Sequence, residues 1–413
     1  MDGRPNIWVV GTFDTKADEL LFLAEHIRSA GLPALTVDIS TQGSDQRADV
    51  AAAEVAHRHE LGQGYVLGGD DRGRAVTAMG EALLRFVIEQ HDAGAIQGML
   101  GIGGSGGTSM IAPAMHALPY GMPKLLVTTM ASGNTSSFVD IHDILVMNPV
   151  TDLAGLNRLS RCILANSAHA ICGMVRMRGG QEERKSKPAI GLSMFGVTTP
   201  CVQTVSHLLQ DQFECQIFHA NGSGGRTMEA LARAGMLSAI VDITTTEVGQ
   251  HLAGGVCDAG PDRLGAAATL GLPWIGSVGA LDMINWGAPS TIPASLSERR
   301  FHVHNPQVTL MRSTGAELEL VAERMAEQLN RSPGIVHLLL PLHGLSALDA
   351  PGKPFHTPEA NKVLFETLER KFQRTELHHL HALPLHINDP EFAQAVAQQV
   401  KTTLAHLAED TAP

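Results

Sequence analysis

The sequence predicts an α/β protein made of two doubly wound, Rossmann-like domains with mainly parallel sheets. Short apolar runs alternate with amphipathic helical stretches along the chain, which is the pattern of parallel strands covered by helices. The 413 residues exceed the length that one hydrophobic core usually organises. Residues 177–188 carry a Gly pair and a cluster of charges, which is typical of a linker. We therefore expect an N-terminal domain over residues 1–180 and a C-terminal domain over residues 188–413.

In the first half, strands are predicted where apolar residues run together, and helices where they recur with helical spacing. Thr15 followed by Asp18 resembles a capping box, and Gly31 is a typical helix end. These signals predict strands at residues 7–11, 34–39, 97–102 and 124–129, and helices at residues 15–30, 46–60 and 74–92 and after residue 107.

The second half repeats the alternation. Pro200 suits the first position of a helix with Thr199 as its cap. Strands are predicted at residues 189–194, 216–220, 238–243, 273–278, 335–340 and 380–386, and helices after Thr199, after Gly225 and at residues 314–330, 358–372 and 390–407. Because each half also contains a Gly-Ser-Gly-Gly sequence after a strand, we suspect a duplication.

The composition argues against several kinds of partner. The formal charge is −12 and aromatic residues are 4% of the chain, which opposes binding to nucleic acid or anionic membrane and leaves few rings for base stacking. The five cysteines are an odd number without CxxC spacing, and the N-terminus lacks the apolar segment of a signal peptide. We expect a cytoplasmic protein with a small-molecule ligand, no nucleic acid partner and no membrane partner.

The strongest chemical signal is the glycine-rich loop that follows the strand at residues 97–102. Glycine amides approach a ligand without obstruction from a Cβ, and the start of the following helix favours an anion such as phosphate or carboxylate. The loop has neither GxGxxG nor GxxxxGK[ST] spacing, so a tight turn that packs helix on strand is the alternative. The candidate binding residues are Gly103, Gly104, Ser105, Gly106, Gly107 and Thr108.

Two other polar segments follow strands of the first half. Ligands of open α/β sheets bind beyond the carboxyl ends of strands, so both segments are placed to share a site with the glycine-rich loop. Lys16 is a candidate partner of a phosphate, and Asp14 of a ribose hydroxyl or Mg²⁺; helix capping by Asp14 and Thr15 is the alternative. The candidate residues are Thr12, Asp14 and Lys16 in the first segment and Ser132, Gly133, Asn134 and Thr135 in the second.

A second glycine-rich loop indicates a substrate site in the second half. Its candidate binding residues are Gly222, Ser223, Gly224, Gly225 and Arg226. The glycines offer amides at a helix start, and the Arg226 guanidinium suits bidentate pairing with a carboxylate or phosphate. Cys201, also in the second half, stands in the first turn of a predicted helix. A helix start lowers the pKa of a thiol, so Cys201 is a candidate nucleophile, and a buried, unreactive cysteine is the alternative.

Acid–base chemistry in the second half has three candidate residues. Glu247 follows the strand at residues 238–243, Asp282 supplies a carboxylate, and His304 belongs to a tight cluster with His302. A His/Asp site serves either as a general acid–base pair or as a divalent-metal site. Because no HExxH or equivalent spacing is present, the sequence leaves a metal undetermined.

Ten motifs occur in order along nearly the whole chain. They are VGTFDTKADEL, GIGGSGGTSM, TMASGNT, MFGVTTPCV, FHANGSGGRTMEAL, VDITTTEV, SVGALDMINWG, HVHNPQVTLMR, SALDAPGKPF and HINDPEFA. Together they resemble the Tm-one-like ATP-binding family. The resemblance implies two Rossmann-like domains, ATP bound in the N-terminal one, and a homodimer, whereas the glycine-rich loops by themselves indicate only an anion.

These observations favour a small-molecule metabolic enzyme that binds ATP, with Mg²⁺ as a further candidate cofactor. It is expected to act on a carboxylate or phosphorylated substrate at the domain interface, and to form a homodimer or higher even oligomer. The alternative is a non-catalytic regulatory protein whose ATP-stabilised dimer binds another protein. An enzyme is expected to gather its polar residues in one cleft, and a binding protein to scatter them.

Overall fold

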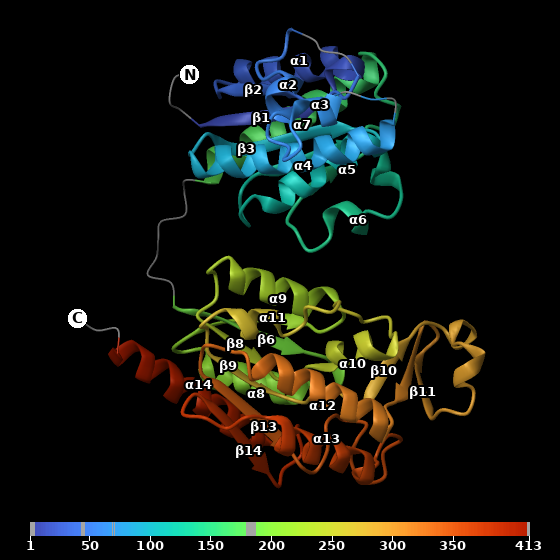
Figure 1. Ribbon diagram of the computed structural model, residues 1–413, viewed down its shortest axis with the longest axis vertical. Coiled ribbons are helices and arrows are strands. Elements are labelled where there is room, and N and C mark those ends of the chain that lie inside the picture. Colours follow the sequence, from blue (N-terminus) through green and yellow to red (C-terminus); the bar gives the residue numbers. More distant parts are fainter. Residues whose placement is uncertain (1–4, 43–45, 68, 70, 179–186, 411–413) are drawn as a thin grey trace. The chain divides into compact units, whose positions relative to one another are not determined.

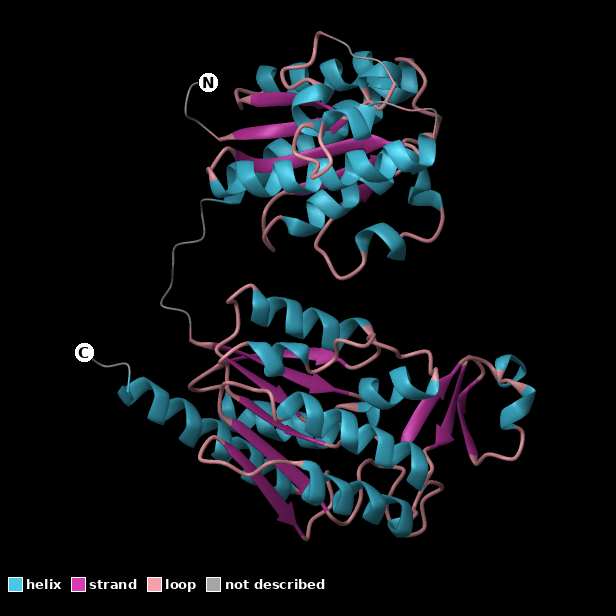
Figure 2. Ribbon diagram, viewed as in Figure 1, coloured by secondary structure: helices cyan, strands magenta, loops and turns pink. Residues whose placement is uncertain are grey.

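The computed structural model describes residues 5–42, 46–67, 69, 71–178 and 187–410. The chain divides into two compact units, Met1–Arg184 and Lys185–Pro413. Each unit is a doubly wound parallel sheet covered by helices, so the predicted fold class is confirmed (Figures 1 and 2). Most of the predicted linker, residues 179–186, lies outside the described residues.

Unit 1 contains a five-stranded sheet in the order β2-β1-β3-β4-β5, and its strand pairs are parallel. Its elements are β1 (Asn6–Gly11), α1 (Phe13–Ser29), β2 (Ala34–Asp38), α2 (Ala52–Ala56), α3 (Gln63–Leu67), α4 (Arg72–Asp92), β3 (Ile96–Gly103), α5 (Ser105–Ala117), β4 (Lys124–Thr128), α6 (Ser136–Val139), β5 (Leu145–Met147) and α7 (Arg158–Met177).

Each face of the unit 1 sheet has its own covering helices (Figure 1). Side chains alternate along β1, so Ile7 and Val9 pack in one cluster with α1 and α7, while Trp8 and Val10 pack in another with α4 and α5. A strand buried on both faces needs apolar residues at every position, which explains the uninterrupted apolar run of β1.

Unit 1 departs from the predicted elements at several places, and its short elements α6 and β5 are also absent from the prediction. Helix α1 begins at Phe13, earlier than predicted, and is kinked at Lys16. The single helix predicted at residues 46–60 is replaced by the short helices α2 and α3, with the left-handed Gly62 (φ +77°) between them. Helix α7 is absent from the prediction, although the capping box of Asn157 and Ser160 marks its start.

Unit 2 contains a six-stranded parallel sheet in the order β14-β13-β9-β8-β6-β7. Its elements are β6 (Ala189–Met194), α8 (Thr199–Leu209), β7 (Glu214–His219), α9 (Ser223–Arg233), β8 (Ala239–Asp242), α10 (Thr246–Ala253), α11 (Gly265–Thr269), β9 (Trp274–Ser277), β10 (Met283–Trp286), β11 (Phe301–Asn305), β12 (Val308–Arg312), α12 (Gly315–Leu329), β13 (Val336–Pro341), α13 (Pro358–Lys371), β14 (His378–Leu383) and α14 (Pro390–Asp410).

The strands β10, β12 and β11 form a separate antiparallel sheet at one side of unit 2 (Figure 2). This small sheet is absent from the prediction, and its strand β11 (FHVHN) has exposed polar residues in place of the uninterrupted apolar run of a buried parallel strand. It packs on unit 2 through a cluster that includes Met283 and Leu310 from the sheet and Phe355 from the segment after β13.

The strand order of each unit determines where a ligand fits best. In unit 1, the chain proceeds from β1 to β2 on one side and from β3 to β4 on the other; in unit 2, the same change of direction falls between β6 and β8. Doubly wound sheets bind ligands beyond the carboxyl ends of the two strands at such a switch point. No helix among the described residues is both long and apolar enough to cross a membrane.

Candidate functional site

Unit 1 has a cavity of about 310 Å³ beyond the carboxyl ends of β1 and β3. Its wall is formed by the turn after β1, the segment after β2, the start of α4 and the glycine-rich loop after β3. The lining residues are Thr12, Asp14, Thr15, Lys16, Thr41, Gln42, Arg72, Val76, Gly104, Ser105, Gly106, Gly107 and Met110. The first predicted polar segment and most of the glycine-rich loop therefore share one cavity.

The amino end of α5 offers backbone amides to this cavity. The cap residue Gly104 has no side chain to accept from the first-turn amides, and no other side chain of the described residues caps them. A Cβ built on Gly106 meets no atom within 4 Å, so the space in front of the loop is open. Uncapped amides and the positive end of the helix dipole favour an anion at this position.

The amino end of α1 differs, because the protein satisfies it internally. The backbone amide of Phe13 donates to Oδ1 of the buried Asp38 at 3.0 Å, and that of Asp14 donates to Oγ of Ser40 at 3.0 Å. An anion in the cavity therefore finds free helix amides at α5, while the α1 turn contributes the side chains of Thr12, Asp14 and Lys16.

Some predicted binding residues of unit 1 do not line the cavity. Gly103 packs the strand on the helix, since a Cβ there would lie 2.9 Å from the Gly107 backbone. Thr108 is buried, and its hydroxyl is hydrogen bonded to that of Thr128 at 2.6 Å. The segment Ser132–Thr135 also lies outside the lining residues.

The structure adds three polar cavity residues that sequence analysis missed, besides the apolar Val76 and Met110. Arg72 begins α4, while Thr41 and Gln42 follow β2. The position of Thr41 and Gln42 beyond a predicted strand was an available signal. Arg72 gave no such signal, because a helix start joins the cavity only through the tertiary fold.

The glycine-rich loop of unit 2 is filled by a side chain of the protein itself. Oε1 of Glu247 accepts from the backbone amides of Gly222 at 2.7 Å and Gly225 at 3.1 Å. A Cβ on Gly225 would lie 1.9 Å from Oε2 of Glu247, so glycine is needed for this close approach. The loop binds an anion as predicted, but the anion is an internal carboxylate rather than a substrate.

Glu247 belongs to a buried ion-pair network around Arg263. The Arg263 guanidinium donates to both oxygens of Asp242 at 2.8 Å, to Glu247 at 2.8 Å and to Glu229 at 3.0 Å. All four side chains are buried, and the three carboxylates raise the pKa of Arg263 well above its ordinary value. The network thus joins β8, α9 and α10 to the segment before α11. Because Glu247 is held in this network, it is not available as a general acid or base.

The other predicted residues of unit 2 are scattered. Arg226 is half-buried in the first turn of α9. His304 lines a cavity of about 510 Å³ with His219 and Asn285. Cys201 is buried in α8, and burial raises the pKa of its thiol to about 12. Cys201 is therefore a buried, unreactive cysteine rather than a nucleophile.

Asp282 is fully buried and accepts a hydrogen bond from Oγ of Ser346 at 2.8 Å. Burial and the nearby Asp349 carboxylate raise the pKa of Asp282 to about 7. Asp282, Glu247 and His304 therefore form no common constellation. Among the described residues, no group of three or more His, Cys, Asp or Glu side chains is arranged to hold a metal ion.

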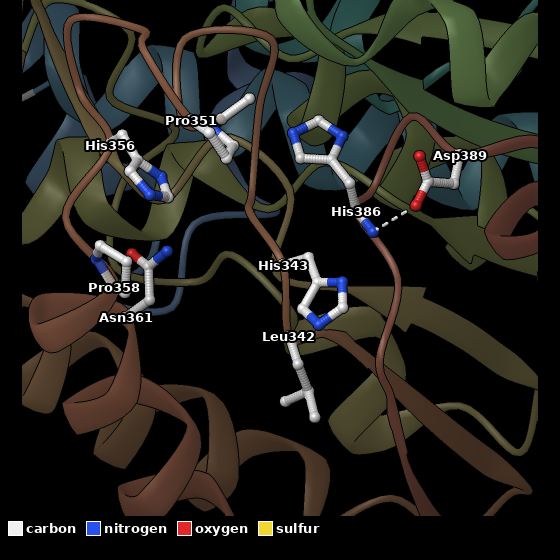
Figure 3. A pocket seen from close by; sticks show the side chains of 9 residues that line it. Leu342, His343, Pro351, His356, Pro358, Asn361, His386 and Asp389 are labelled. Carbon is white, nitrogen blue, oxygen red and sulfur yellow. Dashed lines mark hydrogen bonds between the residues drawn. The ribbon is translucent and has the colours of Figure 1, made fainter.

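A cavity of about 550 Å³ lies beyond the carboxyl ends of β13 and β14 (Figure 3). Three histidines line it together with aliphatic and proline side chains. His356 and Asn361 stand on one side, and His386 and Asp389 on the other. The lining residues are Leu342, His343, Ala350, Pro351, His356, Pro358, Asn361, His386 and Asp389.

The fold and the cavities together define the class of protein. It is an α/β protein of two doubly wound units, with pockets beyond the carboxyl ends of parallel strands. Residues 5–180 match the N-terminal domain, and residues 187–404 the C-terminal domain, of Uncharacterised protein family (UPF0261). The chain belongs to this family.

Its relatives include bacterial and plant proteins. A UPF0261 protein of Mesorhizobium japonicum is 50% identical, over 95% of this chain and 97% of its own length. One of Rhizobium meliloti is 48% identical, over 94% and 96%. The tomato ToMV resistance protein Tm-1(GCR237) is 40% identical over 95% of this chain, which spans 55% of that protein. The resemblance to Tm-one-like proteins is thereby confirmed.

Proposed function

We propose that unit 1 binds ATP in the cavity between the turn after β1 and the glycine-rich loop after β3. The observation that carries this proposal is the uncapped amino end of α5, which opens onto a cavity at the switch point of a doubly wound sheet. The corresponding loop of unit 2 supports it by contrast, because there the protein supplies its own carboxylate.

The cavity residues suit the parts of a nucleoside triphosphate. The amides of Ser105, Gly106 and Gly107 face the phosphates, and the side chains of Lys16 and Arg72 offset their charge. Asp14 serves a ribose hydroxyl or a phosphate-bound Mg²⁺. The family resemblance implies that the nucleotide is ATP. The loop by itself indicates only that an anion binds there.

We further propose that the protein is an enzyme acting on a small molecule, rather than a regulatory binding protein. The predicted acid–base residues Glu247, Asp282 and His304 are scattered, but the cavity beyond β13 and β14 gathers three other histidines and the Asp389 carboxylate in one place. ATP binding in unit 1 does not require this second group of polar residues. A homodimer or higher even oligomer is proposed from the resemblance, and sedimentation velocity tests it: a monomer at all micromolar concentrations contradicts it.

Isothermal titration calorimetry with ATP tests the nucleotide site. Wild-type protein is expected to bind ATP with micromolar-to-millimolar affinity, and Gly106→Val to abolish binding while leaving the thermal stability near wild type, because its side chain enters open space. Gly173→Val is the matched control, since this exposed glycine of α7 also has open space around its Cβ and lies outside the cavity. Unchanged affinity in Gly106→Val shows that the loop is only structural.

A further inference from the structure

Two buried polar atoms at the 550 Å³ cavity face each other and have no hydrogen-bond partner among the described residues. They are Oδ1 of Asp349 and Nδ1 of His356, 3.8 Å apart. Leaving buried polar atoms unpaired is energetically unfavourable. A movement of the His356 ring by about 1 Å brings the pair to hydrogen-bond distance, and His356 is only half-buried, in the segment before α13.

Asp349 is held so that its free oxygen stays directed at His356. Its other oxygen, Oδ2, accepts from the backbone amide of Leu345 at 2.9 Å and from Nδ2 of Asn361 at 2.6 Å. Asn361 is fixed in turn, because its own oxygen accepts from the buried Arg312 at 2.7 Å. A carboxylate locked in this way orients a histidine, as the acid of a catalytic triad does.

The three histidines of the cavity are not equivalent. At His386, Nε2 donates to the Ser346 carbonyl at 3.0 Å, and Nδ1 accepts from the Asn388 amide at 3.1 Å, so both ring nitrogens are occupied. His343 is exposed. Among the described contacts of the cavity, only the His356 ring has a carboxylate beside it. A carboxylate at this position favours the tautomer with the proton on Nδ1, in which Nε2 can accept a second proton.

Protonation of Asp282 reduces the charge repulsion around Asp349. Its carboxyl is buried beside Asp349, and burial together with the Asp349 charge raises the pKa of Asp282 to about 7. Near neutral pH, Asp282 is therefore protonated in a large fraction of molecules, which removes a like charge from beside Asp349.

We propose that this cavity binds a small hydroxylated molecule, that Nε2 of His356 accepts the proton of its hydroxyl group, and that Asp349 is the positioning residue. The O–H bond breaks and an N–H bond forms, which leaves negative charge on the substrate oxygen and an imidazolium facing Asp349. The volume of about 550 Å³ suits a metabolite, Pro351 and Pro358 offer apolar contacts to C–H groups, and Asp389 accepts from further hydroxyls.

The proposal deepens the enzymatic part of the proposed function and is independent of ATP binding. Its first test is the tautomer of His356 in full-length protein labelled with ¹⁵N-histidine, measured by long-range ¹H–¹⁵N correlation and assigned with His356→Gln and His386→Gln. Wild-type protein is expected to carry the proton on Nδ1. In Asp349→Asn, the amide group faces Nδ1 as a donor and the proton moves to Nε2.

His386 is the internal control, because its hydrogen bonds predict the Nε2–H tautomer in both proteins. A wild-type His356 with its proton on Nε2, or an Asp349→Asn variant with an unchanged tautomer, overturns the role of Asp349. If Asp349→Asn fails to fold, the tautomer of His356 in wild-type protein still tests the role of Asp349.

The second test probes ligand binding through the reactivity of Nε2. Full-length protein is treated with diethyl pyrocarbonate, and modification of each histidine is followed by mass spectrometry with and without glycerate, gluconate, glycerol or glucose. At least one probe is expected to slow modification of His356 by about fivefold or more near saturation, without affecting His207 on α8, which is outside the lining.

The acid and neutral probes separate a hydroxy acid from an uncharged polyol. Protection by none of the four, or equal protection of His207, overturns the proposed ligand class. ATP calorimetry on the same preparations keeps the two proposals apart: Asp349→Asn is expected to bind ATP like wild type, and loss of ATP binding by Gly106→Val leaves the His356 tautomer unchanged.

Discussion

At the scale of single residues, the environment of a carboxylate decides its role. Glu247, Asp282 and Asp349 are all fully buried in unit 2. Glu247 is paired with a guanidinium and two backbone amides, whereas Asp282 lies beside another carboxylate. The first arrangement holds a carboxylate among fixed donors, whereas burial and the second carboxylate raise the pKa of Asp282 and favour its protonated form.

Replacing Glu247 tests its structural role. Glu247→Gln removes a negative charge from the Arg263 network and weakens the acceptor at the amides of Gly222 and Gly225. We expect the free energy of unfolding to fall by about 3–5 kcal/mol, the usual result of breaking a buried ion pair. Glu327→Gln, which changes an exposed Glu in an i,i+3 pair with Arg324, is the control, with a change of about 0.5 kcal/mol or less.

Urea denaturation of the wild type and the two variants gives these energies. A Glu247→Gln variant as stable as the control would show that the network contributes little to folding.

The raised pKa of Asp282 predicts a pH-dependent stability. Because this pKa is about 7 in the folded protein and 3.8 ordinarily, the folded state binds more protons between about pH 4 and pH 7. The stability contributed by Asp282 is therefore present at low pH and is lost as the pH rises through this window. Asp282→Asn is expected to gain stability relative to wild type between pH 5 and pH 8 by about 2.5 kcal/mol, because about two pH units of this range lie below the raised pKa.

Urea unfolding at both pH values measures the difference, with Asp211→Asn as an exposed control. The same stability difference between Asp282→Asn and wild type at pH 5 and pH 8 would contradict the raised pKa.

At the scale of elements, the two glycine-rich loops show how similar sequences take different roles. Both precede a helix, and both present the backbone amides of glycines at the start of that helix. In unit 2 the anion arrives from α10 as Glu247. In unit 1 the amino end of α5 keeps no side-chain cap and opens onto a cavity.

The loops are expected to respond differently to one methyl group. In Gly225→Ala the new Cβ would lie 1.9 Å from Oε2 of Glu247, while in Gly106→Ala it meets open space. We expect Gly225→Ala to destabilise the protein by about 2 kcal/mol or more. Gly106→Ala is expected to leave the stability unchanged or to raise it by up to about 1 kcal/mol. Thermal denaturation followed by circular dichroism compares them. Equal effects would mean that the unit 2 loop relaxes around the methyl group.

At the scale of the whole molecule, each unit has the features of an independent folding unit. Unit 1 buries two apolar clusters against its own sheet, and unit 2 has three clusters of its own. The matched family domains, residues 5–180 and 187–404, fall within the two units.

Separate expression of residues 1–184 and 185–413 tests this independence. Each fragment is expected to unfold cooperatively in urea, because its core is complete. The first fragment is expected to retain the ATP affinity of the whole chain within about threefold, since the lining residues of that cavity all belong to unit 1. A fragment without a cooperative transition would show that the units depend on each other for stability.

The sequence by itself determined the fold class and most of the parallel strands. A strand covered on both faces must be apolar throughout, as β1 is, so its position is visible in a local window. The same holds for the site of unit 1. Thr12, Lys16 and the glycine-rich loop follow strands, and the carboxyl ends of neighbouring parallel strands meet at one edge.

Only the tertiary structure decided what the polar residues of unit 2 do. Glu247 and Arg263 are separated along the chain from each other and from the glycines they serve, and no local pattern shows that a carboxylate will fill a loop elsewhere. Likewise, the pairing of Asp349 with His356 depends on how the segment after β13 folds back before α13. Periodicity reflects burial and is local, whereas charge pairing depends on distances that only the folded chain sets.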